Sequence, residues 1–150
     1  MSYIDPMELK PSVLRTLGGR KVLKSGTVGE VRRRIARGLR GYALAHVERT
    51  LHLSVAESVS IFGISPATRK RILKAKVRPL PPVVADRAVR AARIFGEAVD
   101  HFGNQAVASD WLRARILALG DERPIDLLDT DIGAQTVHQL LVQMEHGMVS

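Results

Sequence analysis

The chain contains no cysteine among its 150 residues, so it can form neither a disulfide nor a thiolate metal site. That absence fits a reducing compartment, and we expect a cytoplasmic protein. No run of about 18 apolar residues occurs, so the sequence predicts no membrane span, and its first residues lack the apolar stretch of a signal peptide. A hydrophobic content of 45% is that of a globular protein rather than a disordered one.

Acidic residues are scarce in the first half of the chain. Residues 1–78 hold 17 Lys/Arg and 5 Asp/Glu, a net charge of +12, whereas residues 79–150 hold 6 and 10, a net charge of −4. The overall charge of +8 therefore combines two segments of opposite sign. A segregated basic segment favours binding to nucleic acid, or less specifically to an anionic membrane surface, over a merely soluble basic protein.

The patterns that catalysis and metal binding require are also missing. The five histidines are scattered, and no pair stands at metal-ligand spacing with a third ligand. Asp126, Asp129 and Asp131 lack the glycine and terminal glutamate of a calcium loop. Gly18-Gly19 has no strand before it and no Lys-Ser/Thr after it, so it is not a phosphate loop. We therefore expect no catalytic residue, no metal and no cofactor.

Apolar residues recur at helical spacing from residue 27 onward, and no stretch alternates over strand length. Thr27 with Glu30, and Ser54 with Glu57, are typical capping boxes. We therefore predict an all-α fold with seven or eight helices. The expected helices lie near 27–40, 42–52, 54–62, 66–76, 84–102, from 104 through at least 112, 124–128 as a single turn, and 130–147.

The spacing of apolar residues also predicts which side of each helix is buried. In the helix near 84–102 the apolar positions spread over a wide arc, which indicates either a dimer or inter-domain surface or burial in the core. Trp111 is expected in the core or half-buried at an interface. The positions expected to point inward are Val55, Ala56, Val59 and Phe62 in one helix and Ile132, Val137, Leu140, Leu141 and Met144 in the last.

Prolines and glycines suggest how the chain is divided. Residues 1–26 contain several of both and show poor periodicity, so we expect a flexible N-terminal arm. Pro79, Pro81 and Pro82 exclude the interior of a helix and predict a hinge. The predicted parts are therefore the arm at 1–26, a DNA-binding part at 27–78 and a helical C-terminal part at 79–150.

Residues 54–76 have the layout of a helix-turn-helix. A short capped helix ends at Gly63, Ile64 occupies the turn, and Ser65 and Pro66 begin a basic second helix. Such a helix fits a major groove about 12 Å wide, where residues near its start reach base edges and later basic residues touch phosphates. The base-edge candidates are Ser65, Ala67, Thr68 and Arg69, and the phosphate candidates are Lys70, Arg71 and Lys74.

Both basic segments have a simpler interpretation. The helix after Ser65 could be a solvated basic helix packed by Ile64, Ile72 and Leu73. The arginine run Arg32–Arg34 could add phosphate contacts or could form an ordinary solvated face. The order of cap, glycine, apolar turn and basic helix favours DNA contact for the first of these segments.

The C-terminal residues carry a family resemblance. The chain resembles the MbcA/ParS/Xre-type antitoxins, which pair with RES-domain toxins, over about residues 42–150, and the helix-turn-helix and Asp86-Arg87 fit the Xre-like part. It departs from the family at Gly120-Asp121, usually Gly-Gly, at Ala114–Ile116, usually a polar or proline turn, and at Arg69, usually apolar. The residues that carry the resemblance are Trp111-Leu112, Ala118-Leu119-Gly120, Pro124–Leu128, Thr130, Gly133 and Glu145–Ser150.

The resemblance implies a dimeric all-α antitoxin that inactivates a RES toxin, an enzyme that degrades NAD+, and that represses its own operon by binding double-stranded operator DNA. The C-terminal region would cover the entrance to the toxin's active site. Because a pocket for dinucleotide phosphates is expected to be cationic, acidic residues near 121–131 and the C-terminal carboxylate suit such a surface. For Asp126 and Thr130, helix capping is the alternative role. The implied toxin-facing residues are Asp126, Asp129, Asp131, Gln135, Glu145, His146, Gly147, Met148, Val149 and Ser150.

Two functions therefore remain open. The first is an antitoxin that joins a DNA-binding part to a dimerising, toxin-binding part. The second is a stand-alone helix-turn-helix transcription regulator whose C-terminal half binds another partner or a ligand. The C-terminal motif favours the antitoxin.

Overall fold

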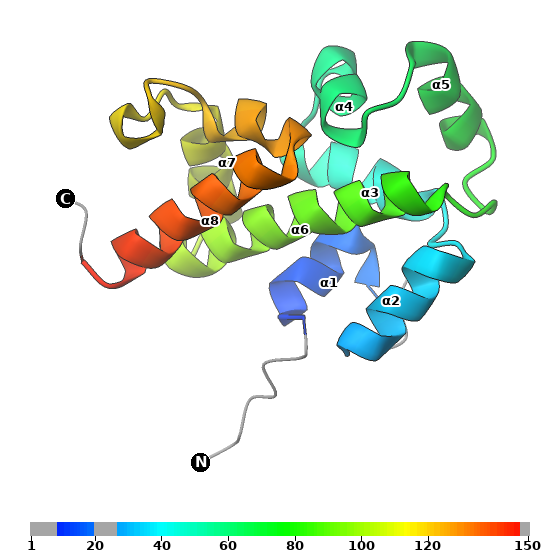
Figure 1. Cartoon of the computed structure of the whole chain (residues 1–150), viewed down its shortest axis with the longest axis horizontal. Helices are drawn as coiled ribbons and strands as arrows, with labels where there is room; N and C mark the ends of the chain where they lie inside the picture. Colours follow the sequence, from blue (N-terminus) through cyan, green and yellow to red (C-terminus); the bar gives the residue numbers. More distant parts are fainter. Residues whose placement is uncertain (1–8, 20–26, 148–150) are drawn as a thin grey trace.

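The computed structural model of the chain describes residues 9–19 and 27–147. Within these ranges the chain is helical, with two isolated backbone bridges and no strand, which confirms the all-α prediction (Figure 1). None of the helices in these ranges has the length and apolar character needed to cross a bilayer. The elements are α1 (Pro11–Leu17), α2 (Val28–Arg37), α3 (Tyr42–Leu51), α4 (Val55–Phe62), α5 (Pro66–Lys74), α6 (Pro82–Phe102), α7 (Gln105–Arg113), the 3-10 turns η2 (Leu117–Leu119) and η3 (Pro124–Asp129), and α8 (Asp131–Glu145).

The predicted helix starts form through local side-chain caps. The Ser54 hydroxyl accepts from the Glu57 amide at 3.1 Å, and the Glu57 carboxylate accepts from the Ser54 amide at 2.9 Å. The side chains of Thr27, Asn104 and Thr130 cap α2, α7 and α8, each accepting from the amide three residues on. These caps satisfy amides that the first helical turn leaves without intrahelical partners, so they fix each helix start in the sequence.

Helix α6 is the central element of the fold. It packs against α1, α2, α3, α4, α7 and α8, and Figure 1 shows it running through the middle of the molecule. Its buried face is rich in alanine, which lets neighbouring helices approach closely, and it contributes to one continuous hydrophobic core. The apolar arc of this helix is covered by the chain's own helices from both predicted parts, so α6 is buried in the core and also joins the two parts.

The proline segment does not form a free hinge. The Leu80 amide donates to the Leu39 carbonyl at 2.6 Å, and the Gly41 and Tyr42 amides donate to the carbonyls of Arg78 and Lys76 at 3.0 and 3.1 Å. The prolines separate α5 from α6 as expected, and Pro82 is the first residue of α6. The hinge prediction is wrong because long-range backbone hydrogen bonds tie the segment to the α2–α3 connection.

Helix α1 lies where a flexible arm is predicted, so that prediction is wrong for Pro11–Leu17. The helix packs on α6 and α3, with Val13 and Leu17 buried. A Cβ added at Gly96 of α6 would lie 2.8 Å from the Val13 Cγ2 and 3.1 Å from its backbone nitrogen, so the glycine permits this close approach. Seven residues are too few to show clear periodicity, and Pro11 begins the helix rather than breaking it. The rest of the predicted arm, residues 1–8 and 20–26, lies outside the described residues.

Three residues predicted to point inward are exposed instead. Val55 is 50% exposed and Ile132 is 75% exposed. The buried side of α8 is formed by Gly133, Ala134 and Val137, and at about 100° per residue Ile132 lies off that side. The prediction is wrong because small residues, which carry little weight in an apolar pattern, decide which side of the helix packs closest. Ala56 is also exposed and Val59 half-buried, whereas Phe62, Val137, Leu140 and Leu141 are buried as predicted.

We predict that α1 is part of the cooperative core. Leu17 is fully buried, so Leu17→Ala should lower the free energy of unfolding by about 2–4 kcal/mol in urea denaturation, because it leaves a cavity. Arg15→Ala, at an exposed position of the same helix, is the control and should change stability little. Equal stabilities of the two variants would show that α1 is not integral to the fold.

Candidate functional site

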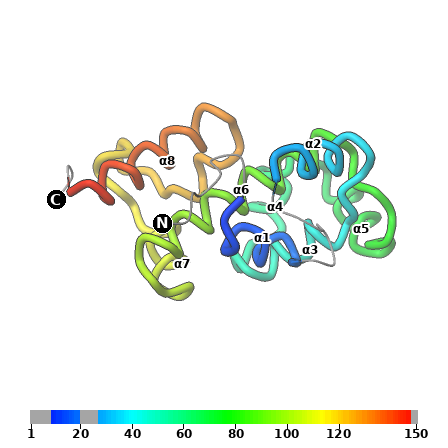
Figure 2. Tube along the Cα trace, turned by 90° about the horizontal axis from the view of Figure 1, so that it is seen from below, coloured from blue at the N-terminus to red at the C-terminus, as the bar shows by residue number. Residues whose placement is uncertain are grey.

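The predicted helix, turn and helix form at α4 and α5. Gly63 ends α4 in a left-handed conformation (φ +65°), which favours glycine. The Ser65 hydroxyl then accepts from the Thr68 amide at 3.0 Å, with Pro66 in the first turn of α5. Figure 2 shows α5 at one end of the molecule, together with α2 and α3, and α7 and α8 toward the other end.

Helix α5 presents most of its predicted contact residues to solvent. Lys70, Arg71 and Lys74 are exposed, as are Ser65 and Ala67 at the helix start. Thr68 is half-buried, and its hydroxyl accepts from the Ser65 hydroxyl at 2.9 Å. The exposed cationic side chains Lys70, Arg71 and Lys74 are therefore available to an external polyanion.

Arg69 departs from its predicted role at base edges. Its Nε lies 3.1 Å from both carboxylate oxygens of Glu48, and its Nη2 lies 2.6 Å from Oε1. The two side chains are only 18% and 10% exposed, so the pair fastens α5 to α3. A forked, charge-assisted contact of this kind holds both groups in place, so Arg69 points inward. In the antitoxin family that the chain resembles, the position of Arg69 is usually apolar. That preference is the signal in the sequence that the residue faces the interior.

The second basic segment lies on α2. Arg32 and Arg33 are exposed, and Glu30 pairs with Arg33 at 3.2 Å and with Arg34 at 3.8 Å. Because α2 lies at the same end of the molecule as α5 (Figure 2), its exposed arginines add to the positive charge there.

Arg113 joins the helix-turn-helix to the C-terminal helices. From α7, its Nη1 lies 2.7 Å from the Glu57 carboxylate at the start of α4. Its Nη2 donates to the carbonyls of Leu51 and His52 at 2.8 and 2.6 Å, at the end of α3. One guanidinium therefore satisfies the free carbonyls of one helix and the capping carboxylate of the next.

Asp126, predicted to face a partner, already has a partner within the chain. Arg123 donates to both of its carboxylate oxygens at 2.8 Å, and Arg123 also lies 3.5 Å from Glu57. The hydrogen bond with Arg123 lowers the pKa of Asp126, and the same bond raises the pKa of Arg123. Burial opposes ionisation of Glu57, but hydrogen bonds from Arg113 and the Ser54 amide, with both guanidinium charges, outweigh it and lower the pKa of Glu57. Asp126 thus helps to hold η3 against α4.

The other predicted toxin-facing residues are spread along α8 and its approach. Asp129, Asp131 and Gln135 are exposed around the first turn. Thr130 caps that turn at 3.0 Å from the Gly133 amide, so the capping alternative is the one observed for Thr130. At the far end Glu145 lies 3.2 Å from His101, and His146 and Gly147 are exposed. Met148, Val149 and Ser150 lie outside the described residues.

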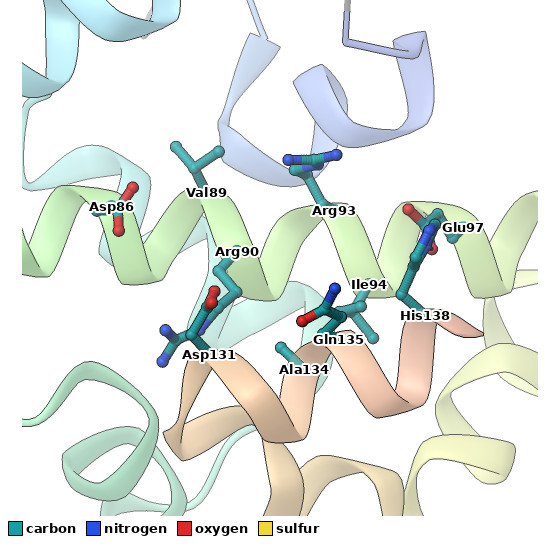
Figure 3. Close-up of a pocket in the computed structure, with 10 residues that line it drawn as sticks. All are labelled: Asp86, Val89, Arg90, Arg93, Ile94, Glu97, Asp131, Ala134, Gln135 and His138. Atoms are coloured by element: carbon teal, nitrogen blue, oxygen red, sulfur yellow. The ribbon is translucent and has the colours of Figure 1, made fainter. Parts of the chain in front are cut away.

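A groove between α6 and α8 is not predicted from the sequence. It has a volume of about 360 Å³ (Figure 3). The His138 Nδ1 lies 2.6 Å from a Glu97 oxygen, and Arg90 donates to the Leu128 carbonyl at 3.1 Å. In the parts of the chain that the structure describes, no group of three or more His, Cys, Asp or Glu residues is placed to hold a metal. The groove is lined by Asp86, Val89, Arg90, Arg93, Ile94, Glu97, Asp131, Ala134, Gln135 and His138.

Fold and charge together define a class of protein. It is all-α, with the basic helices α2 and α5 at one end and the C-terminal helices α7 and α8 toward the other (Figure 2). Residues 91–147 match the family model of the antitoxin Xre/MbcA/ParS C-terminal toxin-binding domain. The resemblance drawn from the sequence is thereby confirmed for the C-terminal part of the chain, which is similar to the toxin-binding domain of the Xre/MbcA/ParS antitoxins.

Individual relatives are also antitoxins. An antitoxin Xre of Photorhabdus laumondii is 39% identical over 67 residues, 44% of this chain and 45% of the relative. An antitoxin Xre of Yersinia enterocolitica is 37% identical over 70 residues, 46% and 47% of the two chains. A Prs ADP-ribosylating antitoxin of Sphingobium is 28% identical over 122 residues, 75% and 76%. The chain thus spans about half the length of the two Xre relatives. These matches agree with the expectation of a neutralising protein rather than an enzyme.

We predict that the ion pairs of Glu57 and Asp126 make stability depend on acid pH. Because both folded-state pKa values are lowered, the pairs stabilise the fold above the ordinary carboxyl pKa of about 4. That contribution is lost as the pH falls through the lowered values. Urea unfolding at a series of pH values should show Glu57→Gln to be less stable than wild type at pH 7, with a shallower loss below about pH 4. Glu122→Gln, at an exposed carboxylate, is the control and should retain the wild-type slope.

Proposed function

We propose that this protein is the antitoxin of a toxin–antitoxin pair, that its toxin is a RES-domain enzyme that degrades NAD+, and that it represses its own operon. The observation that carries the proposal is the match of residues 91–147 to a toxin-binding domain. In the fold, α7 and α8 of this region lie toward the end of the molecule opposite the basic helices α2 and α5 (Figure 2). The two proposed partners therefore have separate surfaces.

The acidic residues beside α8 suit the proposed toxin. Asp129 and Asp131 are exposed on either side of the Thr130 cap, where the capped turn holds their backbone in place. A toxin pocket that accepts dinucleotide phosphates needs positive charge, so carboxylates at its entrance are complementary to it. Asp126 is left out of this proposed contact because it pairs with Arg123. The residues at the C-terminus complete the proposed contact.

The double variant Asp129→Asn/Asp131→Asn should weaken binding to the RES protein encoded in the adjacent reading frame. We expect roughly a tenfold loss, mostly in the association rate and largest at low salt, because rim charges act through steering. Calorimetry and stopped-flow binding measure it, alongside inhibition of NAD+ consumption and growth rescue by co-expression. Asp110→Asn, at an exposed carboxylate of α7, is the matched control. If the wild-type chain neither binds nor inhibits the RES protein, the proposed function is wrong.

We infer that α5 contacts operator DNA. Lys70, Arg71 and Lys74 are placed to touch phosphates, and Ser65, Ala67 and Thr68 to approach base edges from the helix start. A single helix-turn-helix covers too little DNA for high specificity, so we propose a homodimer on half-sites about one helical turn apart. The buried face of α6 is not available for that dimer contact.

Lys70→Ala/Lys74→Ala should weaken DNA binding similarly for all sequences and reduce the log–log salt slope by about 2 per protomer, because each phosphate contact releases about 0.9 counterion. Electrophoretic or fluorescence titrations between 50 and 200 mM salt, about the range over which such contacts dominate, test this. Arg93→Ala, at an exposed position of α6, is the control and should leave the slope unchanged. An unchanged salt slope in the double variant would show that α5 does not contact the DNA phosphates.

A stand-alone regulator that senses a ligand is the second candidate. The groove between α6 and α8 favours it, because Arg90, Arg93 and Gln135 offer polar groups to a small molecule within about 360 Å³. This candidate predicts DNA binding that responds to a small ligand in the absence of any toxin. If no complex with a RES protein forms and DNA binding responds to a small ligand, the protein is a ligand-sensing regulator.

A further inference from the structure

The outward side of α8 carries charge only near its two ends, at Asp131 and Glu145. The exposed residues between these two positions are neutral. The exposed positions of the neighbouring α6, by contrast, include Asp86, Arg93 and Asp100. Depletion of charge is a signature of the central part of a protein–protein interface. The neutral outward residues of α8 are Ile132, Gln135, Thr136, Gln139, Val142 and Gln143.

Ile132 is the most exposed apolar residue of this side, at 75%. The helix holds it in place, since the Thr136 hydroxyl donates to the Ile132 carbonyl at 2.8 Å. A Cβ at Gly133 would overlap the Leu127 carbonyl, so that glycine lets η3 pack directly against the first turn of α8. These contacts fix the backbone that carries Ile132, so the position of this residue on the helix surface is set before a partner covers it.

The residues around Ile132 indicate which kind of partner fits. Asp129 and Asp131 flank it with negative charge, which excludes a nucleic-acid phosphate surface. A two-fold contact with a second copy centred on Ile132 would bring these carboxylates against their own equivalents, which is unfavourable. A protein with an apolar pocket and a cationic rim is complementary in both respects.

We propose that Ile132 is the apolar anchor of the contact with the cognate toxin, inserted into such a pocket. The inference rests on the proposed function and on the position of Ile132 within residues 91–147, which match a toxin-binding domain. It differs from the acidic contact above because a buried anchor governs the dissociation rate, whereas rim charges govern association.

The experiment compares full-length Ile132→Ser, Ile132→Leu and wild type for binding to the RES protein of the adjacent reading frame. Ile132→Ser should weaken binding at least tenfold through faster dissociation, and Ile132→Leu should stay within a few-fold of wild type. All melting temperatures should agree, because the side chain is exposed. Val83→Ser is the matched control: Val83 is 62% exposed on α6, outside residues 91–147, and its substitution should leave toxin affinity unchanged.

The outcomes separate the inference from the function on which it rests. Wild-type affinity in Ile132→Ser overturns the anchor while leaving the antitoxin proposal in place. Loss of self-association in Ile132→Ser, seen by light scattering with toxin affinity unchanged, overturns it in favour of a contact between copies of this chain. A wild-type chain that does not bind the RES protein overturns both.

Discussion

The packing of α6 is the constraint on which the rest of the fold depends. Helices from both halves of the chain bury their apolar sides against it, and its alanine-rich surface is closed on one flank by α1. The helices before α6 and the helices after it consequently share one core rather than two. The family match begins at residue 91, in the middle of this helix, so a boundary defined by similarity does not coincide with a boundary in packing.

The contacts of Arg113 add a directional link to this shared core. Apolar burial holds the two ends together without specifying their register, whereas a guanidinium bonded to Leu51, His52 and Glu57 fixes α7 against α3 and α4. Arg123 extends the same network to Asp126 in η3. The start of the helix-turn-helix is therefore positioned by residues that follow it by more than fifty positions in the sequence.

The features of this fold that can be predicted from the sequence are those that depend on interactions between residues close together in the chain. Ser54, Thr27 and Thr130 act within four residues of themselves, so their caps and the helix starts can be predicted correctly. Arg69 and Asp126 could not be placed, because their orientation depends on Glu48 and Arg123 and on how the helices pack.

The same limit applies to packing by small residues. Gly96 and Gly133 admit close contacts whose partners, α1 and η3, are visible only in three dimensions. The groove between α6 and α8 likewise arises from two helices that the sequence describes separately.

The arrangement also bears on how a toxin and operator DNA would bind the same small protein. Helix α5 lies at one end of the molecule, whereas the first turn of α8, which carries the proposed toxin contacts, lies near the middle, beside η3 and α4 (Figure 1). We expect any effect of toxin on operator binding to pass through α6, through the Glu57–Arg113 contact, or through a change in the dimer. Because a close-packed core transmits displacement rather than absorbing it, a small shift of η3 against α4 is the shortest such route. The charge network at that junction lies between α4 and η3, so in the proposed function Glu57 is the position at which a change in stability and a change in coupling would both be expected.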